Sequence, residues 1–192
     1  MRRGIGVACV IVGLICLLGA VGLVSYNRLE AYEANQISQA MLQDVKVRIE
    51  KCEQVDDRED NTMKADASGC IGILSIPVLE LELPVLTEWS DAKLKKAPCH
   101  YYGSCYEENF VIMAHNYRTH FGRLSELIEK DLVLFTDITG KVHCYEVVLL
   151  ETLPEMATEE MLTSGFDLSL YTCTPSGSNR ITVRCKAVEV GR

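Results

Sequence analysis

An uninterrupted apolar run near the N-terminus limits what this chain can fold into more than any other feature. Arg2 and Arg3 are followed by 21 residues, Gly4 to Val24, none of which is charged. As a helix this run is about 30 Å long, which matches the hydrocarbon thickness of a bilayer. It exceeds the apolar part of a signal peptide, roughly 7–15 residues, and residues 25–28 lack a small-residue cleavage site. The sequence therefore predicts an uncleaved membrane anchor over residues 1–27.

Charge on the two sides of the run predicts its orientation. Both arginines precede it, and basic residues favour the cytoplasmic side, so the chain after Val24 is expected outside the cell. That part contains 17 lysines and arginines against 27 acidic residues, a net charge of −10. Such a surface repels nucleic-acid phosphates and anionic lipids. We expect a single-pass protein of the cell membrane with a cytoplasmic N-terminus, an extracellular domain and no nucleic-acid partner.

Residues 28–66 predict a stalk between the membrane and the folded domain. Up to residue 52, apolar side chains recur every three to five residues among polar ones, which is typical of a helix with a narrow apolar stripe. The stripe consists of Leu29, Tyr32, Ile37, Met41, Val45 and Ile49. From Glu53 to Thr62 the periodicity ends and acidic residues dominate, which predicts a solvated linker. The folded domain is expected over residues 67–192.

The sequence of this domain is typical of a mainly β protein. Short apolar runs are separated by turn residues, and they predict strands at Cys70–Ile76, Leu79–Leu83, Phe110–Ala114, Leu132–Phe135 and Val142–Leu150. Ser90–Lys96 and Glu155–Leu162 predict short helices. Many short strands with few helices indicate a small closed β-barrel. The hydrophobic content of 48% suffices for one packed core.

Three chemically reactive side chains stand at the ends of predicted strands. The apolar run Leu170–Cys173 ends on a thiol, turns through residues 175–179, and returns as a strand that begins at Arg180. Facing residues of such a hairpin lie about 5 Å apart, so the thiol and the guanidinium can reach one acyl group. His115 follows another strand and offers a proton acceptor. Together they offer a nucleophile, an acid–base group and an oxyanion donor.

This set of motifs resembles the sortase family of membrane-anchored cysteine transpeptidases, found mainly in Gram-positive bacteria. The family's T-L-x-T-C, downstream Arg and G-H-x motifs correspond to Ser169-Leu170-Tyr171-Thr172-Cys173, Arg180 and Ala114-His115-Asn116. Ser169 and Ala114 replace the usual Thr and Gly, both small-for-small changes. Further matches are Gly72 to Pro77, Phe121-x-x-Leu124 and Asp131-x-Val133, so the resemblance covers about residues 68–190.

The resemblance implies a sortase-type β-barrel and a specific reaction. Cys173 would cleave the C-terminal sorting motif of secreted proteins, hold the acyl group as a thioacyl-enzyme, and transfer it to an amine of a peptidoglycan precursor or cross-bridge. His115 and Arg180 would assist as catalytic residues, with no cofactor or metal. Substrate contacts are expected from Thr172, Asn116 and Ala114.

The subclass stays open on the sequence. The chain lacks the aromatic lid motif and the second membrane span usual in pilin-polymerising sortases, which favours attachment to the cell wall over pilus assembly. Asn116 and the predicted helix before Ser169 resemble class B more than class A.

Residues of the same types offer alternatives within the site. His120 is five residues from His115, and we expect it to be a surface or loop histidine, like His100 and His143. Arg184 shares a strand face with Arg180, and distance from the turn favours Arg180. Six further cysteines (52, 70, 99, 105, 144 and 185) allow 15 disulfide pairings, or all are free thiols. Cys99, His100, Cys105, His143 and Cys144 raise the possibility of a metal site, although their spacing matches no standard zinc motif.

Two other classes of function fit the same residues. A cysteine protease or amidase would use the Cys–His pair and release the acyl group to water. A non-enzymatic ectodomain stapled by disulfides would bind a partner, and Cys173 would then be paired. Labelling with an amine nucleophile and alkylation of the thiol discriminate these hypotheses from a transpeptidase.

Overall fold

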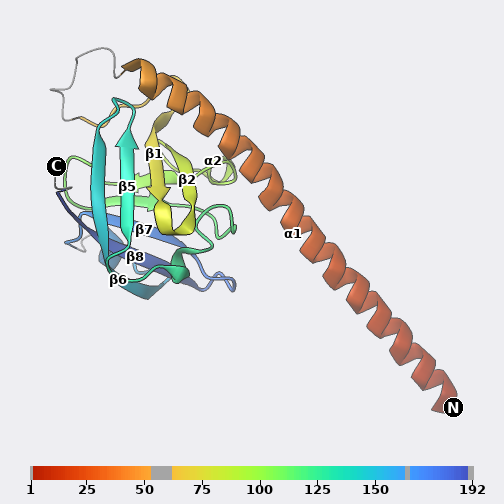
Figure 1. The fold of residues 1–192 in the computed structure, drawn as a ribbon. Coiled ribbons are helices and arrows are strands. Elements are labelled where there is room, and N and C mark those ends of the chain that lie inside the picture. Colours follow the sequence, from red (N-terminus) through yellow and green to blue (C-terminus); the bar gives the residue numbers. More distant parts are fainter. Residues whose placement is uncertain (1, 53–61, 163–164, 190–192) are drawn as a thin grey trace. The chain divides into compact units, whose positions relative to one another are not determined.

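The computed structural model describes residues 2–52, 62–162 and 165–189, and it shows one long helix and a β-barrel (Figure 1). Helix α1 (Arg2–Cys52) contains a segment that is long and apolar enough to cross a membrane. Residues 28–52 are helical as predicted, whereas the predicted acidic linker lies outside the described residues except for Thr62. The chain divides into two compact units, Met1–Glu33 and Ala34–Arg192.

The described part of the second unit contains eight strands, which close in the order β1-β2-β3-β4-β7-β8-β6-β5. Their bounds are β1 (Cys70–Ile76), β2 (Leu81–Leu86), β3 (Cys99–Tyr102), β4 (Phe110–Met113), β5 (Leu132–Asp137), β6 (Val142–Pro154), β7 (Leu168–Cys173) and β8 (Asn179–Ala187). Neighbours are antiparallel except β2–β3 and β4–β7, which are parallel. The short helices are α2 (Asp91–Leu94) and α3 (Thr158–Leu162), with 3₁₀ turns η1 (Pro77–Leu79) and η2 (Leu124–Glu126). The predicted closed barrel is confirmed.

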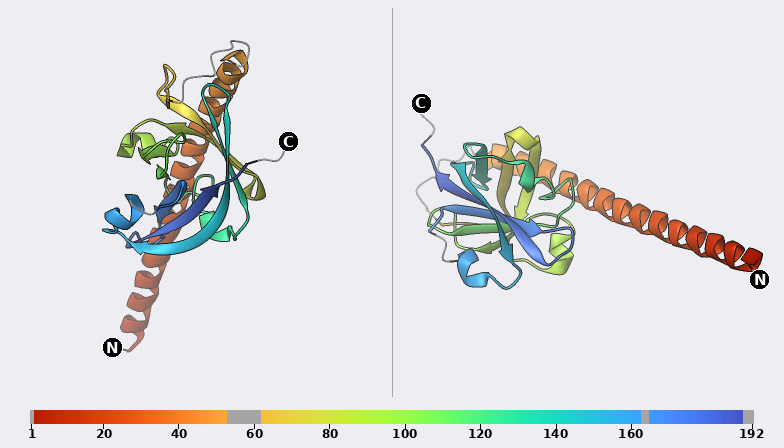
Figure 2. Two further views of the ribbon diagram at one scale, coloured as in Figure 1. Left: turned by 90° about the vertical axis from the view of Figure 1, so that its left-hand side faces the viewer. Right: turned by 90° about the horizontal axis from the view of Figure 1, so that it is seen from below.

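The barrel is filled by the inward-facing residues of its strands. Because side chains alternate across a strand, every second residue of β1, β5 and β7 points into the barrel. Phe110 and Phe135 meet edge to face at its centre, with ring centroids 5.0 Å apart. The long strand β6, seen as a curved ribbon in Figure 2, shifts register between Val147 and Leu149. Such a bulge lets one strand bend around the barrel.

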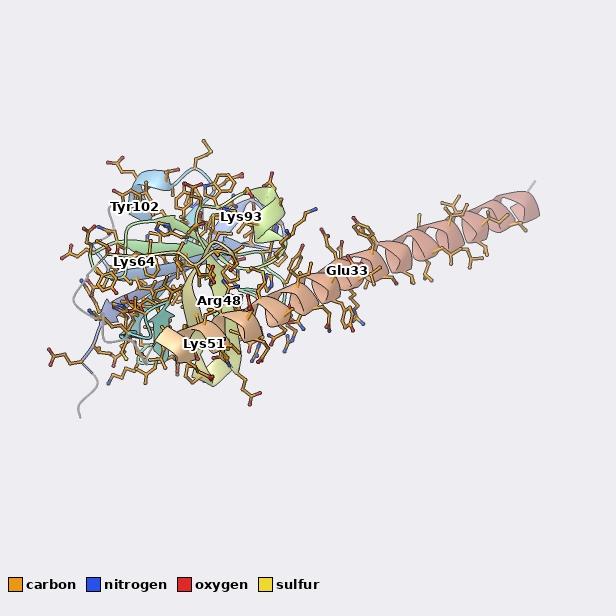
Figure 3. The ribbon with its side chains drawn as sticks, turned by 90° about the horizontal axis from the view of Figure 1, so that it is seen from above. Glu33, Arg48, Lys51, Lys64, Lys93 and Tyr102 are labelled. Carbon is orange, nitrogen blue, oxygen red and sulfur yellow. The ribbon has the colours of Figure 1, made fainter. Side chains whose placement is uncertain are left out.

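The C-terminal part of α1 packs against the outside of the barrel in the same unit. Leu42, Val45 and Ile49 are buried in a cluster with β1 and β2 residues such as Ile73 and Leu86. Of the predicted apolar stripe, Val45 and Ile49 are buried in this interface and Met41 packs against it, whereas Leu29, Tyr32 and Ile37 are exposed. Two ion pairs flank the interface: Lys46 Nζ lies 2.6 Å from Glu82 Oε2, and Arg48 Nη1 lies 2.7 Å from Asp66 Oδ2. Figure 3 labels Arg48 on the part of α1 beside the barrel.

Several element bounds differ from the sequence-based expectation. The strand expected from Leu79 begins at Leu81, because Pro77 starts a 3₁₀ turn that ends on Glu80 in the left-handed conformation, with φ of 50°. β2 contains Pro84, which it tolerates because its other neighbour, β3, pairs with β2 only at Leu86. β6 continues to Pro154, so α3 begins later than expected, at Thr158.

Candidate active site

Three strand ends meet at one end of the barrel. β4 and β7 run parallel, with Met113 beside Tyr171, so the residues that follow Met113 and Tyr171 lie at the same edge. His115 follows β4, and Cys173 is the last residue of β7. β8 returns antiparallel, and its Arg180 lies opposite Cys173, as the hairpin pattern predicted.

These three side chains line one cavity of about 440 Å³. Its other walls are largely apolar. They come from α2 and the segment before it, and from β3, β4, β7 and α3, with Trp89, Leu94, Tyr101, Met113, Met161 and Tyr171 as the apolar residues. Tyr101 meets Tyr171 edge to face, with ring centroids 5.7 Å apart. A thiol, an imidazole and a guanidinium thus share one pocket with largely apolar walls.

Two of the three residues expected to contact substrate join the strands. Thr172 and Ala114 are both buried and both border the cavity. The Thr172 hydroxyl donates a 2.8 Å hydrogen bond to the Ala114 carbonyl oxygen, one residue before Cys173 and one before His115. This bond holds the chain at the thiol against the chain at the imidazole. Asn116 is exposed and is not among the residues that line the cavity.

The loop that carries His115 is closed by backbone hydrogen bonds and by a glycine. The Phe121 N–H donates to the His115 carbonyl at 3.2 Å, and the Gly122 N–H donates to the Tyr117 carbonyl at 2.9 Å. A Cβ at Gly122 would lie 2.4 Å from the Asn116 carbonyl oxygen. Only glycine therefore lets the loop close this tightly behind the imidazole.

Contacts to its own turn and to one carboxylate orient Arg180. Its Nη1 donates to the carbonyls of Gly177 at 2.9 Å and Asn179 at 3.2 Å. Its Nη2 donates to Glu155 Oε1 at 3.0 Å, where the Glu155 side chain is 58% exposed. An ion pair this exposed is weak, so the guanidinium keeps its ability to bind a second anion in the cavity.

The sequence of the barrel matches a known domain family. The model of the sortase domain matches residues 74–188. The chain belongs to the sortase family. Sortases are cysteine transpeptidases, and a thiol in a peptide-sized cavity agrees with that chemistry.

Solved sortase structures share the fold at low sequence identity. The Clostridium perfringens sortase D5 transpeptidase has a TM-score of 0.64 at 17% identity, covering 80% of this chain and 99% of its own. Streptococcus pneumoniae sortase C has a TM-score of 0.59 at 24% identity, covering 76% of this chain and 90% of its own. Corynebacterium diphtheriae sortase A has a TM-score of 0.58 at 21% identity, covering 85% of this chain and 92% of its own. A comparison with curated proteins gave no match. These neighbours carry the names of three sortase classes, so they do not select a subclass.

His120 of this sortase lies in the loop after His115, as one of the two expected alternatives had it, but it is not at the surface. It is fully buried, and neither ring nitrogen has a hydrogen-bond partner within the described residues. Burial, and to a lesser degree the neighbouring His115, lowers its pKa to about 4. Its burial was not expected, because it depends on the turn that the Gly122 N–H closes on the Tyr117 carbonyl, and no local pattern reveals that closure. A neutral ring buried behind Tyr117 packs the loop from within.

Arg184, the alternative arginine of the sortase, has a structural position. It is fully buried, and its Nε donates to Glu151 Oε1 at 2.7 Å. Its other nitrogens donate to the Ser169 hydroxyl at 2.9 Å and to the Glu160 carbonyl at 2.7 Å. It is not among the residues lining the cavity that contains Cys173. Of the two arginines, the structure brings Arg180 to the thiol and uses Arg184 to join β8 to β6, β7 and α3.

The cysteines with described side chains are free thiols. Burial raises the pKa of Cys70 and Cys99 to about 11, and that of Cys185 to about 12. These three are therefore small apolar side chains at neutral pH. Cys173 is partly exposed at the cavity, where a nucleophile can meet a substrate.

Proposed function

We propose that this sortase cleaves a C-terminal sorting peptide of secreted proteins through a thioacyl-enzyme on Cys173 and transfers it to a cell-wall amine. The observation that carries the proposal is the convergence of His115, Cys173 and Arg180, from three strand ends, on one cavity. A thiol nucleophile, an acid–base group and a fixed cation are the parts that acyl transfer requires.

The first half-reaction forms a thioester. The Cys173 sulfur, having given its proton to His115, attacks the carbonyl carbon of the scissile amide. The carbonyl oxygen becomes an oxyanion, which Arg180 stabilises from the facing position of β8. When the C–N bond breaks, His115 returns the proton to the leaving amine, and the upstream peptide stays on the sulfur.

The second half-reaction transfers the acyl group. An incoming amine gives a proton to His115 as its nitrogen attacks the thioester carbon. The collapse of this intermediate forms a new amide and releases the Cys173 thiolate, which recovers a proton from His115. No net proton or electron is consumed, so amide exchange needs no cofactor.

The cavity favours an apolar residue in the sorting peptide. Trp89, Tyr101 and Tyr171 form an aromatic wall beside the thiol, with neighbouring ring centroids 6.4 and 5.7 Å apart. Aromatic walls bind apolar side chains through a large contact area. We therefore expect a bulky apolar residue a few positions before the scissile bond.

The anchor places this reaction at the cell surface in our proposal. The N-terminus would be cytoplasmic, the apolar part of α1 would span the membrane once, and the catalytic domain would be extracellular. In that position the enzyme meets secreted proteins before release and peptidoglycan amines in the wall. Residues 1–27 would be the anchor, 28–66 the stalk and linker, and 67–192 the catalytic barrel.

Trapping of the acyl-enzyme tests this function. The full-length chain in detergent is incubated with a panel of sorting-type peptides without an amine, and mass spectrometry should find the upstream fragment on Cys173. Hydroxylamine should release it as a hydroxamate, and oligoglycine should convert it to ligated peptide. Cys173→Ala should give none of these products.

Two outcomes contradict the proposal. Hydrolysis that persists unchanged over a wide panel of amines makes the enzyme a cysteine protease or amidase. A folded protein that no peptide labels at Cys173, with that thiol oxidised in the cell-derived protein, makes the domain a binding module.

A further inference from the structure

A second group of reactive side chains lies at the other end of the barrel. Cys105 follows β3, Asp137 ends β5, and His143 is the second residue of β6. Their sulfur, oxygen and nitrogen atoms all lie within 4.8 Å of one another. β6 pairs with β8 so that Tyr145 lies beside Ala187 while Pro154 lies beside Asn179. His143 and Pro154, which borders the cavity of Cys173, are 11 residues apart along β6, at about 3.3 Å each.

The three side chains are withdrawn from solvent and already arranged. The Asp137 Oδ1 accepts hydrogen bonds from the Thr139 N–H at 2.8 Å, the Thr139 hydroxyl at 2.6 Å and the Lys141 N–H at 3.1 Å. Its Oδ2 accepts from the Tyr106 hydroxyl and faces His143. The His143 side chain is only 12% exposed and lies on β6, so the expectation of a surface or loop histidine was wrong here. Its neighbour on the same face, Tyr145, is itself a core residue.

The imidazole of His143 has a buried nitrogen without a hydrogen bond. Nε2 is inaccessible to solvent, and it faces Asp137 Oδ2 at 3.5 Å, an ion-pair contact that is longer than an ordinary N–H···O hydrogen bond. A ligand between the two atoms would satisfy both of them better than this long contact does. Two ligand atoms held about 2.1 Å from one tetrahedral ion are about 3.4 Å apart. The observed separation of 3.5 Å is compatible with one shared metal ion.

Cys105 is buried beside the Asp137 carboxylate, a position that disfavours a second nucleophile. A carboxylate beside a thiol opposes the thiolate that acyl transfer needs, whereas a divalent cation stabilises the thiolate and the carboxylate together.

We propose that Cys105, Asp137 and His143 bind a zinc ion, with water as the fourth ligand. Thiolate, imidazole and carboxylate in a set of three are ligands that Zn²⁺ accepts, whereas Ca²⁺ and Mg²⁺ take oxygen. Binding replaces the thiol proton, which leaves as H⁺. Cys105 and His143 border a cavity of about 440 Å³ that provides room for the water and whose rim includes Glu107, Glu108 and Asp167. These acidic residues attract a cation.

The ion would link two segments that the backbone leaves separate. Cys105 belongs to the loop between β3 and β4, whereas Asp137 and His143 flank the β5–β6 turn. One metal bridging them would pin that loop over the end of the barrel opposite the candidate active site. We therefore expect metal binding to raise the thermal midpoint of unfolding.

Cobalt titration of the full-length chain in detergent tests the site. Cys173→Ser serves as the background, because the candidate active-site thiol and imidazole would otherwise compete for the metal. After removal of metal with a chelator, one equivalent of Co²⁺ should give a thiolate-to-cobalt charge-transfer band. Zn²⁺ should abolish the band as it displaces Co²⁺, and should raise the thermal midpoint.

Ligand substitutions in the same background locate the metal. Cys105→Ser should remove the band, and His143→Gln should weaken Co²⁺ affinity at least about 100-fold, since even partners outside the ligand set change it 10–100-fold. Cys99→Ser and His100→Gln alter a thiol and an imidazole outside the group. Both variants should keep the charge-transfer band and the Co²⁺ affinity. Circular dichroism verifies that each variant is folded. An undiminished band in folded Cys105→Ser, or no band at one equivalent in the Cys173→Ser protein, overturns the proposal.

Discussion

At the scale of single residues, one buried hydrogen bond couples the two halves of the candidate catalytic pair. Thr172→Val keeps the shape of the side chain but leaves the Ala114 carbonyl without its donor. We expect a loss of about 1–2 kcal/mol in the free energy of unfolding and a lower turnover, because the spacing of Cys173 and His115 loosens. Denaturant unfolding and peptide turnover measure the two effects.

A second buried threonine supplies the matched control. The Thr182 hydroxyl is buried and has no partner within the described residues, so Thr182→Val removes an unsatisfied group. It should be neutral or stabilising. Equal destabilisation by the two substitutions would show that the hydrogen bond from Thr172 to Ala114 does not contribute to the free energy of unfolding.

The two arginines of β8 should separate activity from stability. Arg180→Ala should lower turnover about 10²- to 10³-fold, as expected for one lost oxyanion donor, with little change in stability. Arg184→Ala leaves Glu151 without its buried partner and should cost about 3–5 kcal/mol in unfolding free energy. Thermal melts and kinetics on both variants provide the comparison, and the opposite pattern would mean that Arg184 is the oxyanion donor.

The lowered pKa of the buried His120 leads us to expect a loss of stability in mild acid. Its pKa is about 4 in the folded chain against an ordinary value of 6.5, so below pH 6.5 only the unfolded state binds this proton. Stability that is fully present above pH 6.5 should fall by roughly 3 kcal/mol as the pH drops to 4. Unfolding free energies at pH 7, 5.5 and 4.5 should show a shallower decline in His120→Gln than in the unsubstituted chain. Parallel declines would assign the acid sensitivity to other groups.

At the scale of elements, α1 belongs partly to the barrel. Val45 is 1% exposed in the cluster with β1 and β2, whereas Val47 on the same helix is 48% exposed. Val45→Ala should lower the free energy of unfolding by about 1–3 kcal/mol, and Val47→Ala should change it by less than about 0.5 kcal/mol. Chemical denaturation of both variants makes the comparison. If Val45→Ala is as silent as Val47→Ala, the helix does not pack on the barrel in solution.

At the scale of the whole molecule, the apolar part of α1 should decide where the enzyme resides. The full-length chain should fractionate with membranes, because burying some 20 apolar residues in lipid is strongly favourable. A chain that begins at Ala34 keeps the helix that packs on the barrel and should be soluble and folded. Protease added to intact cells should digest the barrel, and complete protection would reverse the proposed orientation.

The amino-acid sequence alone determined the features that depend on neighbours along the chain. The apolar run, the helix after it, and the strand ends at His115 and Cys173 follow from local periodicity and turn residues. The pairing of Cys173 with Arg180 was also readable, because a short turn sets the register of a hairpin.

Only the tertiary structure decided the features that depend on barrel closure. His120 was expected at the surface or in a loop, and Arg184 on the strand face of Arg180, yet residues distant in the chain bury both side chains. Cys105 and His143 were noticed, but Asp137 was not, because it meets them only when β5, β6 and the β3–β4 loop converge. Burial and convergence are set by contacts between residues far apart in sequence, and such contacts leave no periodic trace in any single segment.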